Sequence, residues 1–511
     1  MSINNQLTQC NQLLERLCAF HGAEISPGPR PRQIEKAVCK LPAGSIWHLY
    51  PPTGSVSLWL LTMNPPFPFQ VIEHSIPAQH IREHPHGING RQEAVLQLAI
   101  KQYVPLDRPD PIPENAVTII GAHGTGFPKV SEPFSSKKES PANNAQEVYE
   151  PLWEDLYAQL KKQSVPLRGI WVADVSNQGA SGVLNEYTQG DNTHWFDHSR
   201  DLLHMTNHFR DEMPRPIIGI AHSMGCAQLI HLSILHPRLL STLILYEPVI
   251  LDIPTTPSPA PNPSLPAALK PDFWPTRATA ETYFAKALRK WDPRARARYL
   301  QYGLRNIPTR LYPTSTPSPT TTTPILTPVT LTTTKHHEAW SYSIPNLTPP
   351  DPNPKLDRLL LPDWDRTLEL PVLFSRPECL AAMRELPFVR PSVLWVFAGR
   401  SYLSGAAEQD RKMSVTGTGT GGSGGAQEGK VSRAVLEKGG HGLVVEEVGW
   451  CAGVAGEWVA RWKGGWLEEE AFWKAYRSGK SDGEMLRSSE VGMEVMRMRM
   501  GSLRGSVRGK L

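Results

Sequence analysis

The fold of this chain is indicated most clearly by the stretch Pro216-Ile-Ile-Gly-Ile-Ala-His-Ser-Met-Gly-Cys-Ala-Gln-Leu-Ile230. A short apolar strand is predicted at Ile217–Ile220, and an apolar helical pattern follows a small-x-Ser-x-Gly turn. A nucleophilic serine needs this strand–turn–helix context, because the sharp turn exposes its hydroxyl above the sheet. Ala221 and Gly225 are small enough for strand and helix to approach each other there. We therefore expect Ser223 to be a nucleophile; the alternative is an ordinary serine in a strand-to-helix turn.

The regions around this turn alternate between strand and helix patterns. Apolar, strand-like runs occur at 116–120, 169–174, 217–220, 243–248 and 392–397, and helical patterns at 92–103, 147–162 and 200–210. Alternating strands and helices predict an α/β fold with a doubly wound, mostly parallel sheet.

Composition divides the chain into a core and several insertions. We expect an N-terminal extension at 1–65, core segments at 66–253 and 371–475, a helical lid insertion at 254–370, and a C-terminal tail at 476–511. The Pro/Thr-rich segment 312–334 and the Gly-rich insert 416–429 have the low complexity of disordered loops. A polar, proline-containing insert is expected at 130–146.

Charge and cysteine usage exclude several classes of protein. The 511 residues carry a net charge of only +4, which does not predict a nucleic-acid-binding protein. The six cysteines are scattered without metal-ligand or disulfide spacing, which favours free thiols in a reducing compartment. Neither a signal peptide nor a membrane-spanning run is predicted. His80 and His84 are four residues apart, but prolines interrupt the helix that would bring them together, so we expect no metal site and no cofactor.

A serine nucleophile needs a general base, and His441 is the best candidate. It lies in Lys438-Gly-Gly-His-Gly442, where flanking glycines let the backbone bring the imidazole over Ser223. His336 and His337 fall in the lid insertion, and His222 is expected to point away from the neighbouring serine.

The oxyanion hole is expected in the loop Gly121-Ala-His-Gly-Thr-Gly-Phe-Pro128, directly after a buried strand. We assign the two backbone donors to Thr125 and to Met224, the residue after the nucleophile. The alternative is a phosphate-binding turn, but this loop lacks the G-x-G-x-x-G spacing.

A serine nucleophile and its histidine form a catalytic triad with a carboxylic acid that orients the histidine. The identity of this acid is less obvious. The segment after the strand at 392–397 contains no carboxylate until Glu408 and Asp410. The strand after the nucleophile ends at Glu247, and Asp252 is the local competitor. We expect Glu247 to orient His441, because the carboxyl ends of neighbouring parallel strands lie together.

Together these motifs resemble the fungal peroxisomal α/β-hydrolases of secondary metabolism, which include the acyl-CoA hydrolase of the mycophenolic acid pathway and the hydrolases of AK-toxin biosynthesis. The resemblance covers roughly residues 66–475 and rests on the stretches 79–83, 116–123, 126–129, 149–153, 198–203, 222–225 and 439–442. It implies an α/β-hydrolase fold with a helical lid, a homodimer, and an acid after the strand that follows the nucleophile. That placement supports Glu247, although the mycophenolate enzyme carries Asp.

The lid insertion contains a basic cluster that includes Arg294, Arg296 and Arg298. Either this cluster is a solvated basic face, or part of it holds the phosphates of coenzyme A, since arginine engages phosphate in a bidentate manner.

The last three residues, Gly509-Lys510-Leu511, resemble the peroxisomal address Ser-Lys-Leu. We expect peroxisomal localisation through the import receptor; a flexible basic tail on a cytoplasmic protein is the alternative.

Three functions remain open at this point. The first is a serine hydrolase acting on an acyl-CoA thioester or an ester. The second is an acyltransferase or lyase on the same scaffold in toxin or polyketide biosynthesis. The third is a non-catalytic α/β-hydrolase-like binding protein. A complete set of Ser223, His441, acid and oxyanion donors argues against the third.

Overall fold

The computed structural model describes residues 67–125, 146–252, 263–313, 327–342, 344–345, 374–403, 405–477 and 480–508. The N-terminal extension, most of the insert at 130–146, residues 126–128 of the predicted oxyanion loop and the C-terminal tripeptide lie outside the described residues.

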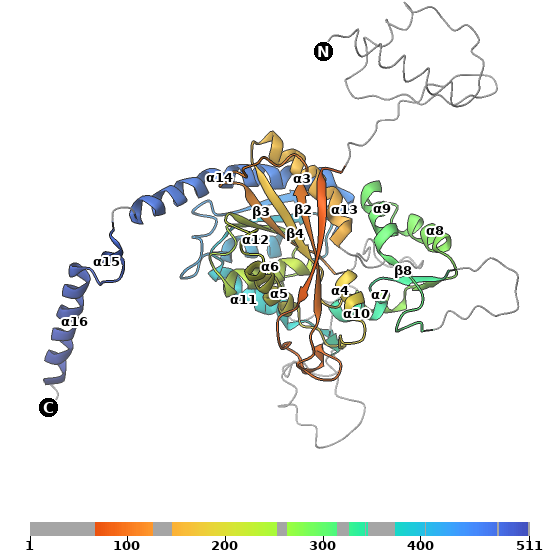
Figure 1. Cartoon of the computed structure of the whole chain (residues 1–511), viewed down its shortest axis with the longest axis horizontal. Coiled ribbons are helices and arrows are strands. Elements are labelled where there is room, and N and C mark those ends of the chain that lie inside the picture. Colours follow the sequence, from red (N-terminus) through yellow and green to blue (C-terminus); the bar gives the residue numbers. More distant parts are fainter. Residues whose placement is uncertain are drawn as a thin grey trace, which may run out of the picture. The chain divides into compact units, whose positions relative to one another are not determined.

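A central sheet carries the fold (Figure 1). Its strands follow the spatial order β1 (Phe69–Pro77), β2 (Gln97–Pro105), β4 (Leu167–Ala173), β3 (Val117–Ala122), β5 (Ile217–His222), β6 (Thr242–Tyr246), β12 (Ser392–Ala398) and β13 (Val431–Leu436). Strand β2 pairs antiparallel with both β1 and β4, and every pair from β4 to β13 is parallel. The predicted doubly wound, mostly parallel sheet is confirmed.

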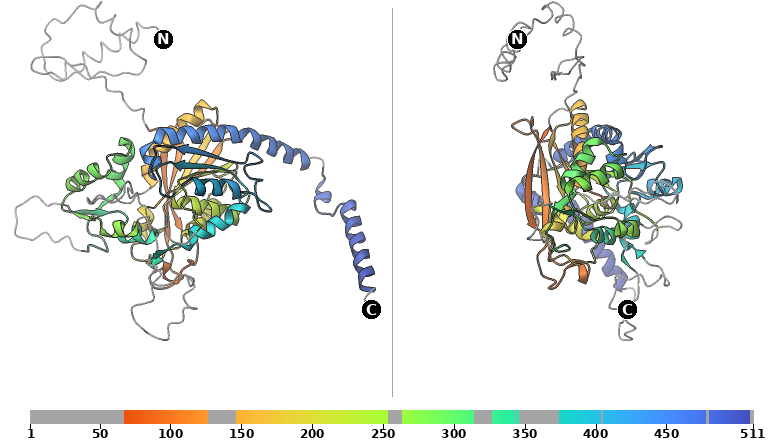
Figure 2. Two further views of the ribbon diagram at one scale, coloured as in Figure 1. Left: turned by 180° about the vertical axis from the view of Figure 1, so that it is seen from behind. Right: turned by 90° about the vertical axis from the view of Figure 1, so that its right-hand side faces the viewer.

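Helices cover both faces of this sheet (Figure 2). The main hydrophobic core joins one face to α5 (Trp195–His208), α6 (Met224–Leu235) and α11 (Pro377–Glu385). The helices α3 (Glu150–Lys162) and α14 (Val448–Arg477) pack against each other and contribute no residue to that core, because they cover the opposite face. The parallel strands are therefore buried on both sides, as their continuous apolar runs require.

The lid insertion contains four helices and a small sheet among its described residues. Its elements are α7 (Ser264–Leu269), β7 (Phe273–Trp274), α8 (Arg277–Ala287), α9 (Pro293–Tyr302), β8 (Leu304–Asn306), β9 (Val329–Leu331) and α10 (Lys335–Tyr342), with β9 between β7 and β8. Strand β9 falls within the Pro/Thr-rich segment 312–334. The expectation of disorder was therefore wrong for residues 327–334 at the end of that segment. Threonine and valine favour strands. The low-complexity composition of the segment led to a prediction of disorder in spite of this strand propensity.

The remaining elements complete the described chain. They are η1 (Pro85–Gly87), η2 (Gln146–Tyr149), α4 (Gly179–Leu184), β10 (Ile344–Pro345), β11 (Phe374–Ser375), η4 (Leu386–Phe388), α12 (Ala406–Val415), α13 (Leu443–Glu446), α15 (Asp482–Met485) and α16 (Glu490–Arg508). Among the described helices, none is both long and apolar enough to cross a membrane.

The prediction of a helix at 92–103 was wrong, because residues 97–103 of this stretch belong to strand β2. Leu96, Leu98 and Ile100 are buried, whereas Gln97 and Ala99 between them are partly exposed. A burial period of two belongs to a strand, so the alternation from Leu96 onward was the better signal.

The Gly-rich insert was expected to be disordered, and this expectation was also wrong. Its backbone is hydrogen bonded to the 386–389 segment: Gly417 N–H donates to Leu386 O at 2.8 Å, and Ser423 N–H donates to Val389 O at 3.0 Å. Gly417 has a φ of 75°, a backbone conformation that favours glycine. The glycines therefore build a compact loop.

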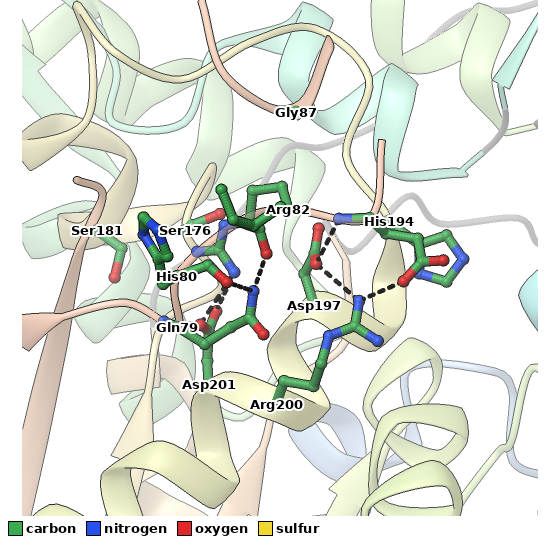
Figure 3. Close-up of polar contacts among 12 residues, drawn as sticks. Gln79, His80, Arg82, Gly87, Ser176, Ser181, His194, Asp197, Arg200 and Asp201 are labelled. Carbon is green, nitrogen blue, oxygen red and sulfur yellow. Dashed lines mark hydrogen bonds and ion pairs between the residues drawn. The ribbon is translucent and has the colours of Figure 1, made fainter. Parts of the chain in front are cut away.

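Two stretches far apart in sequence meet next to β1 (Figure 3). The guanidinium of Arg82 binds both carboxylate oxygens of Asp201 on α5 at 2.9 and 3.0 Å, and Gln79 N–H donates to the same carboxylate. Arg200, one residue earlier on α5, binds both Asp197 and Glu83. This network, which is buried at Arg82 and Asp201 and more exposed at Arg200 and Glu83, fixes the loop after β1 to the helix.

Candidate active site

Ser223 occupies a strained turn between β5 and α6. Its backbone has φ 55° and ψ −117°, and its amide N–H donates to Tyr246 O at 2.9 Å. A Cβ atom at Gly225 would lie only 2.3 Å from Ala122 O, so only glycine fits there. Strain held by the surrounding hydrogen bonds is typical of functional turns. The geometry is that of a nucleophile elbow.

His441 faces the hydroxyl of Ser223 from the loop between β13 and α13. Its Nε2 lies 3.0 Å from Ser223 Oγ, and its Nδ1 lies 3.3 Å from Glu247 Oε2. The structure therefore brings together all three residues that the sequence analysis assigned to a triad. These distances suit proton transfer from the serine hydroxyl to the imidazole.

Glu247 follows β6 directly and is completely buried. Its backbone adopts φ 47°, and its Oε1 accepts the amide N–H of Ala398 at 2.6 Å. The competing acids have other partners: Asp252 pairs with Arg411, Asp410 with Arg433 and Glu408 with Lys412. Of the four acids considered from sequence, Glu247 is the one that meets His441.

The predicted oxyanion donors, Thr125 and Met224, lie next to each other. Thr125 Oγ1 is 2.9 Å from the sulfur of Met224. In the part of the chain that the structure describes, neither of their backbone N–H groups has an acceptor. Two such amides facing one site can bind the oxyanion of an acyl-transfer intermediate.

The neutral imidazole of His123 orients this oxyanion loop. Val175 N–H donates to its Nε2 at 3.1 Å, so the proton is on Nδ1, which donates to Gly124 O at 3.0 Å. Burial lowers the pKa of His123, which keeps the ring neutral. Because the carbonyl and the N–H of a trans peptide point in opposite directions, this bond turns the N–H of Thr125 away from His123.

The lid reaches the oxyanion loop through Tyr342, at the end of α10. Its hydroxyl donates to Thr125 O at 3.1 Å, and Gln178 Nε2 lies 3.3 Å from Thr125 Oγ1. Sequence reasoning missed Tyr342, Gln178 and the role of His123. Only His123 had a signal, namely its place before a glycine in the oxyanion loop; nothing in the lid sequence singles out Tyr342.

Two of the three arginines named from the basic cluster of the lid, Arg294 and Arg298, are engaged by carboxylates. Arg294 binds Asp155 at 2.7 Å and also contacts Glu154 and Asp292, and Arg298 binds Glu150 at 2.6 Å. The ion pairs with Glu150, Glu154 and Asp155 attach α9 to α3, whereas Asp292 is the residue just before α9. Arg296 has no carboxylate partner among the described residues. Of the three arginines considered for phosphate binding, Arg296 is the one whose guanidinium is not committed to an acid.

Burial makes Glu150 an unusual partner for Arg298. Burial raises the pKa of its carboxyl to about 6, although Arg298 and Lys101 oppose this shift. The contact between lid and core therefore includes a group that titrates in mildly acidic solution.

A metal site is not evident within the described ranges, which contain no group of three or more histidines, cysteines or acids arranged to hold an ion. His84 is buried against the ring of His194, whereas His80 is exposed.

The fold, the elbow and the Ser223–His441–Glu247 geometry define a class of enzyme. The chain belongs to the alpha/beta hydrolase family, whose model matches residues 120–454, and the protein is a hydrolase.

Individual proteins that resemble this chain include an acyl-CoA thioesterase and a solved peroxisomal hydrolase. The chain is 37% identical over 427 residues to the "Type I acyl-CoA thioesterase mpaH" of Penicillium brevicompactum, covering 81% of this chain and 92% of the relative. It is 24% identical over 251 residues to the "Abhydrolase domain-containing protein AFT2-1" of Alternaria alternata, covering 49% of this chain and 85% of the relative. Among solved structures, the peroxisomal alpha-beta-hydrolase Lpx1 of Saccharomyces cerevisiae superimposes with a TM-score of 0.53 at 16% identity, covering 86% of this chain and 98% of Lpx1. The resemblance drawn from the motifs is confirmed.

Proposed function

We propose that the protein hydrolyses an acyl-CoA thioester or ester through a triad of Ser223, His441 and Glu247. The observation that carries the proposal is the chain of contacts from Ser223 Oγ to His441 Nε2 at 3.0 Å and from His441 Nδ1 to Glu247 at 3.3 Å. The substrate class is taken from relatives named as acyl-CoA thioesterases.

The reaction follows from these positions. Ser223 Oγ attacks the acyl carbon while His441 Nε2 takes its proton, and the carbonyl oxygen becomes an oxyanion facing the N–H groups of Thr125 and Met224. The carbon–sulfur bond then breaks, His441 returns the proton to the leaving thiolate, and the acyl group stays on Ser223. Water, deprotonated by His441, attacks the acyl-enzyme; the bond between the acyl carbon and Ser223 Oγ breaks, His441 returns the proton to Ser223 Oγ, and the acid is released. Glu247 keeps the proton of His441 on Nδ1 and stabilises the imidazolium.

Purified protein and a panel of acyl-CoAs test this proposal. Free coenzyme A and free acid are expected in equal amounts, with loss of turnover in Ser223→Ala and His441→Ala. Transfer of the acyl group to an added alcohol or amine without release of the acid would identify an acyltransferase instead. Substantial turnover by either variant would contradict the triad.

Two further properties are part of the proposal. The resemblance to fungal hydrolases of secondary metabolism supports a place in such a pathway and a homodimer, for which sedimentation of the purified protein is the test. The Gly509-Lys510-Leu511 terminus supports import into peroxisomes. A reporter carrying the last twelve residues that stays diffuse in a fungal cytosol would contradict the localisation.

A further inference from the structure

A chain of hydrogen bonds runs behind the candidate active site and joins its three loops. Gly124 N–H donates to the hydroxyl of Tyr149 at 2.9 Å, and this hydroxyl lies 3.1 Å from His222 Nδ1. His222 Nε2 lies 2.9 Å from the backbone carbonyl oxygen of His441. Gly124 precedes Thr125, His222 precedes Ser223, and His441 supplies the imidazole that meets Ser223.

One assignment of protons satisfies every contact in this chain. The carbonyl oxygen of His441 can only accept, so His222 Nε2 carries a proton. Burial, and then the proximity of His441, lowers the pKa of His222 well below its usual range, so its Nδ1 is an acceptor. Burial raises the pKa of Tyr149, so its hydroxyl keeps a proton, which it donates to Nδ1 while its oxygen accepts from Gly124. Each hydrogen bond of this series thus has one defined donor and one defined acceptor.

The surroundings hold both rings in place. Tyr149 and His222 are 3% and 2% exposed, and the cavity that they line has a volume of only about 10 Å³. That space is no larger than a single water molecule needs. A Cβ atom at Gly124 would lie 2.7 Å from His222 Nδ1, so the oxyanion loop approaches this ring as closely as only glycine allows.

From this geometry we infer that Tyr149 and His222 form a positioning bridge, which fixes the backbone of the His441 loop and of the oxyanion loop relative to Ser223. Neither residue touches the reacting atoms. The bridge rests on the proposed function, because it positions that triad. Its neutral His222 can bind the His441 carbonyl without placing a positive charge beside the imidazolium that forms during catalysis.

Two sets of variants test the bridge. Tyr149→Phe removes the hydroxyl and keeps the ring, and Tyr157→Phe is its matched control, because Tyr157 on α3 donates its hydroxyl to Asp107 away from Ser223. His222→Leu removes both contacts of the imidazole, whereas His222→Gln keeps a donor for the His441 carbonyl. For each variant, kcat and KM on an acyl-CoA and the rate of fluorophosphonate labelling are measured, with circular dichroism to verify folding.

The bridge predicts a fall in kcat of between about 10-fold and 100-fold for Tyr149→Phe and His222→Leu, with KM nearly unchanged and a parallel fall in labelling rate. His222→Gln should recover part of the loss, and Tyr157→Phe should resemble the wild type. Folded Tyr149→Phe and His222→Leu proteins with the kcat of Tyr157→Phe would overturn the bridge, while an inactive Ser223→Ala would leave the proposed function standing. Full turnover by Ser223→Ala would overturn both.

Discussion

The carboxylate of Glu247, at the end of β6, is held by the amide N–H of Ala398 at the end of the neighbouring strand β12, at 2.6 Å. The two strands are parallel neighbours, with Tyr246 paired to Val396. Their carboxyl ends therefore open onto the same space, and an acid on either strand can reach His441. The backbone of β12 contributes a hydrogen-bond donor even though its own following segment does not supply the acid.

This arrangement predicts the behaviour of Glu247→Gln. The amide oxygen of glutamine would accept from Ala398, which turns its NH₂ group toward His441 Nδ1 and favours the proton on Nε2, the wrong tautomer for accepting the proton of Ser223. We expect kcat to fall by about 10⁴-fold with little change in folding. Steady-state kinetics on an acyl-CoA measures this, with Asp252→Asn and Asp410→Asn as controls that stay near wild type. A silent Glu247→Gln beside an inactive Asp410→Asn would refute the assignment of the acid.

Variants of Arg294 and Arg296 are expected to distinguish a loss of substrate binding from a loss of the contact between the lid and the core. Because Arg294 binds carboxylates of α3, Arg294→Gln should weaken hydrolysis of an acyl-CoA and of a small uncharged ester alike. Arg296→Gln should raise KM for the acyl-CoA and leave the small ester unaffected if Arg296 contacts a phosphate. Comparison of the two substrates measures this difference. Equal losses on both substrates for Arg296→Gln would exclude phosphate recognition by this residue.

The buried pair of Arg82 and Asp201 is expected to be important for stability. Both side chains are almost completely buried, and in Asp201→Asn the guanidinium loses its charged partner. Removal of one partner of a buried pair costs about 3–5 kcal/mol in the free energy of unfolding. Asp410→Asn, which breaks the more exposed pair with Arg433, should cost less than about 1 kcal/mol. Urea unfolding measures both, and equal costs would contradict the importance of the buried pair.

Buried histidines should make the protein less stable in mild acid. Burial lowers the pKa of His123, His194, His198, His222 and His337 in the folded state. The unfolded chain therefore binds protons first as the pH falls through about 6.5, and each such histidine removes up to about 1.4 kcal/mol of stability per pH unit. Glu150, with its pKa raised to about 6, acts in the opposite direction between pH 6 and 4.5 and offsets about one of them.

Urea unfolding at pH 7.5, 6.5 and 5.5 should show the net loss. His198→Leu should reduce the change in the free energy of unfolding per pH unit, because the imidazole of His198 is buried with no hydrogen-bond partner among the described residues. Stability that stays constant or rises as the pH falls to 5.5 would contradict this account.

The sequence predicted the parts of the candidate site that short motifs encode. The elbow around Ser223, the glycines beside His441 and the loop before Thr125 each need particular residues at fixed spacing, so they can be recognised without a structure. The bridge through Tyr149 depends on which loops the fold brings together, and no local pattern reports this. Strand β13 was missed because it is an edge strand whose Ser432 and Arg433 face partly outward, which interrupts the apolar run. The Gly-rich insert was misjudged because composition does not reveal its backbone hydrogen bonds.

The central claim is that Ser223 becomes covalently acylated, and peptide mass spectrometry after reaction with a fluorophosphonate tests it most directly. The triad predicts one adduct on the peptide that contains Ser223, formed at a rate that falls by more than about 100-fold in His441→Ala. It also predicts no adduct in Ser223→Ala. An adduct on another residue, or a folded wild-type protein that hydrolyses acyl-CoA without reacting, would contradict the claim.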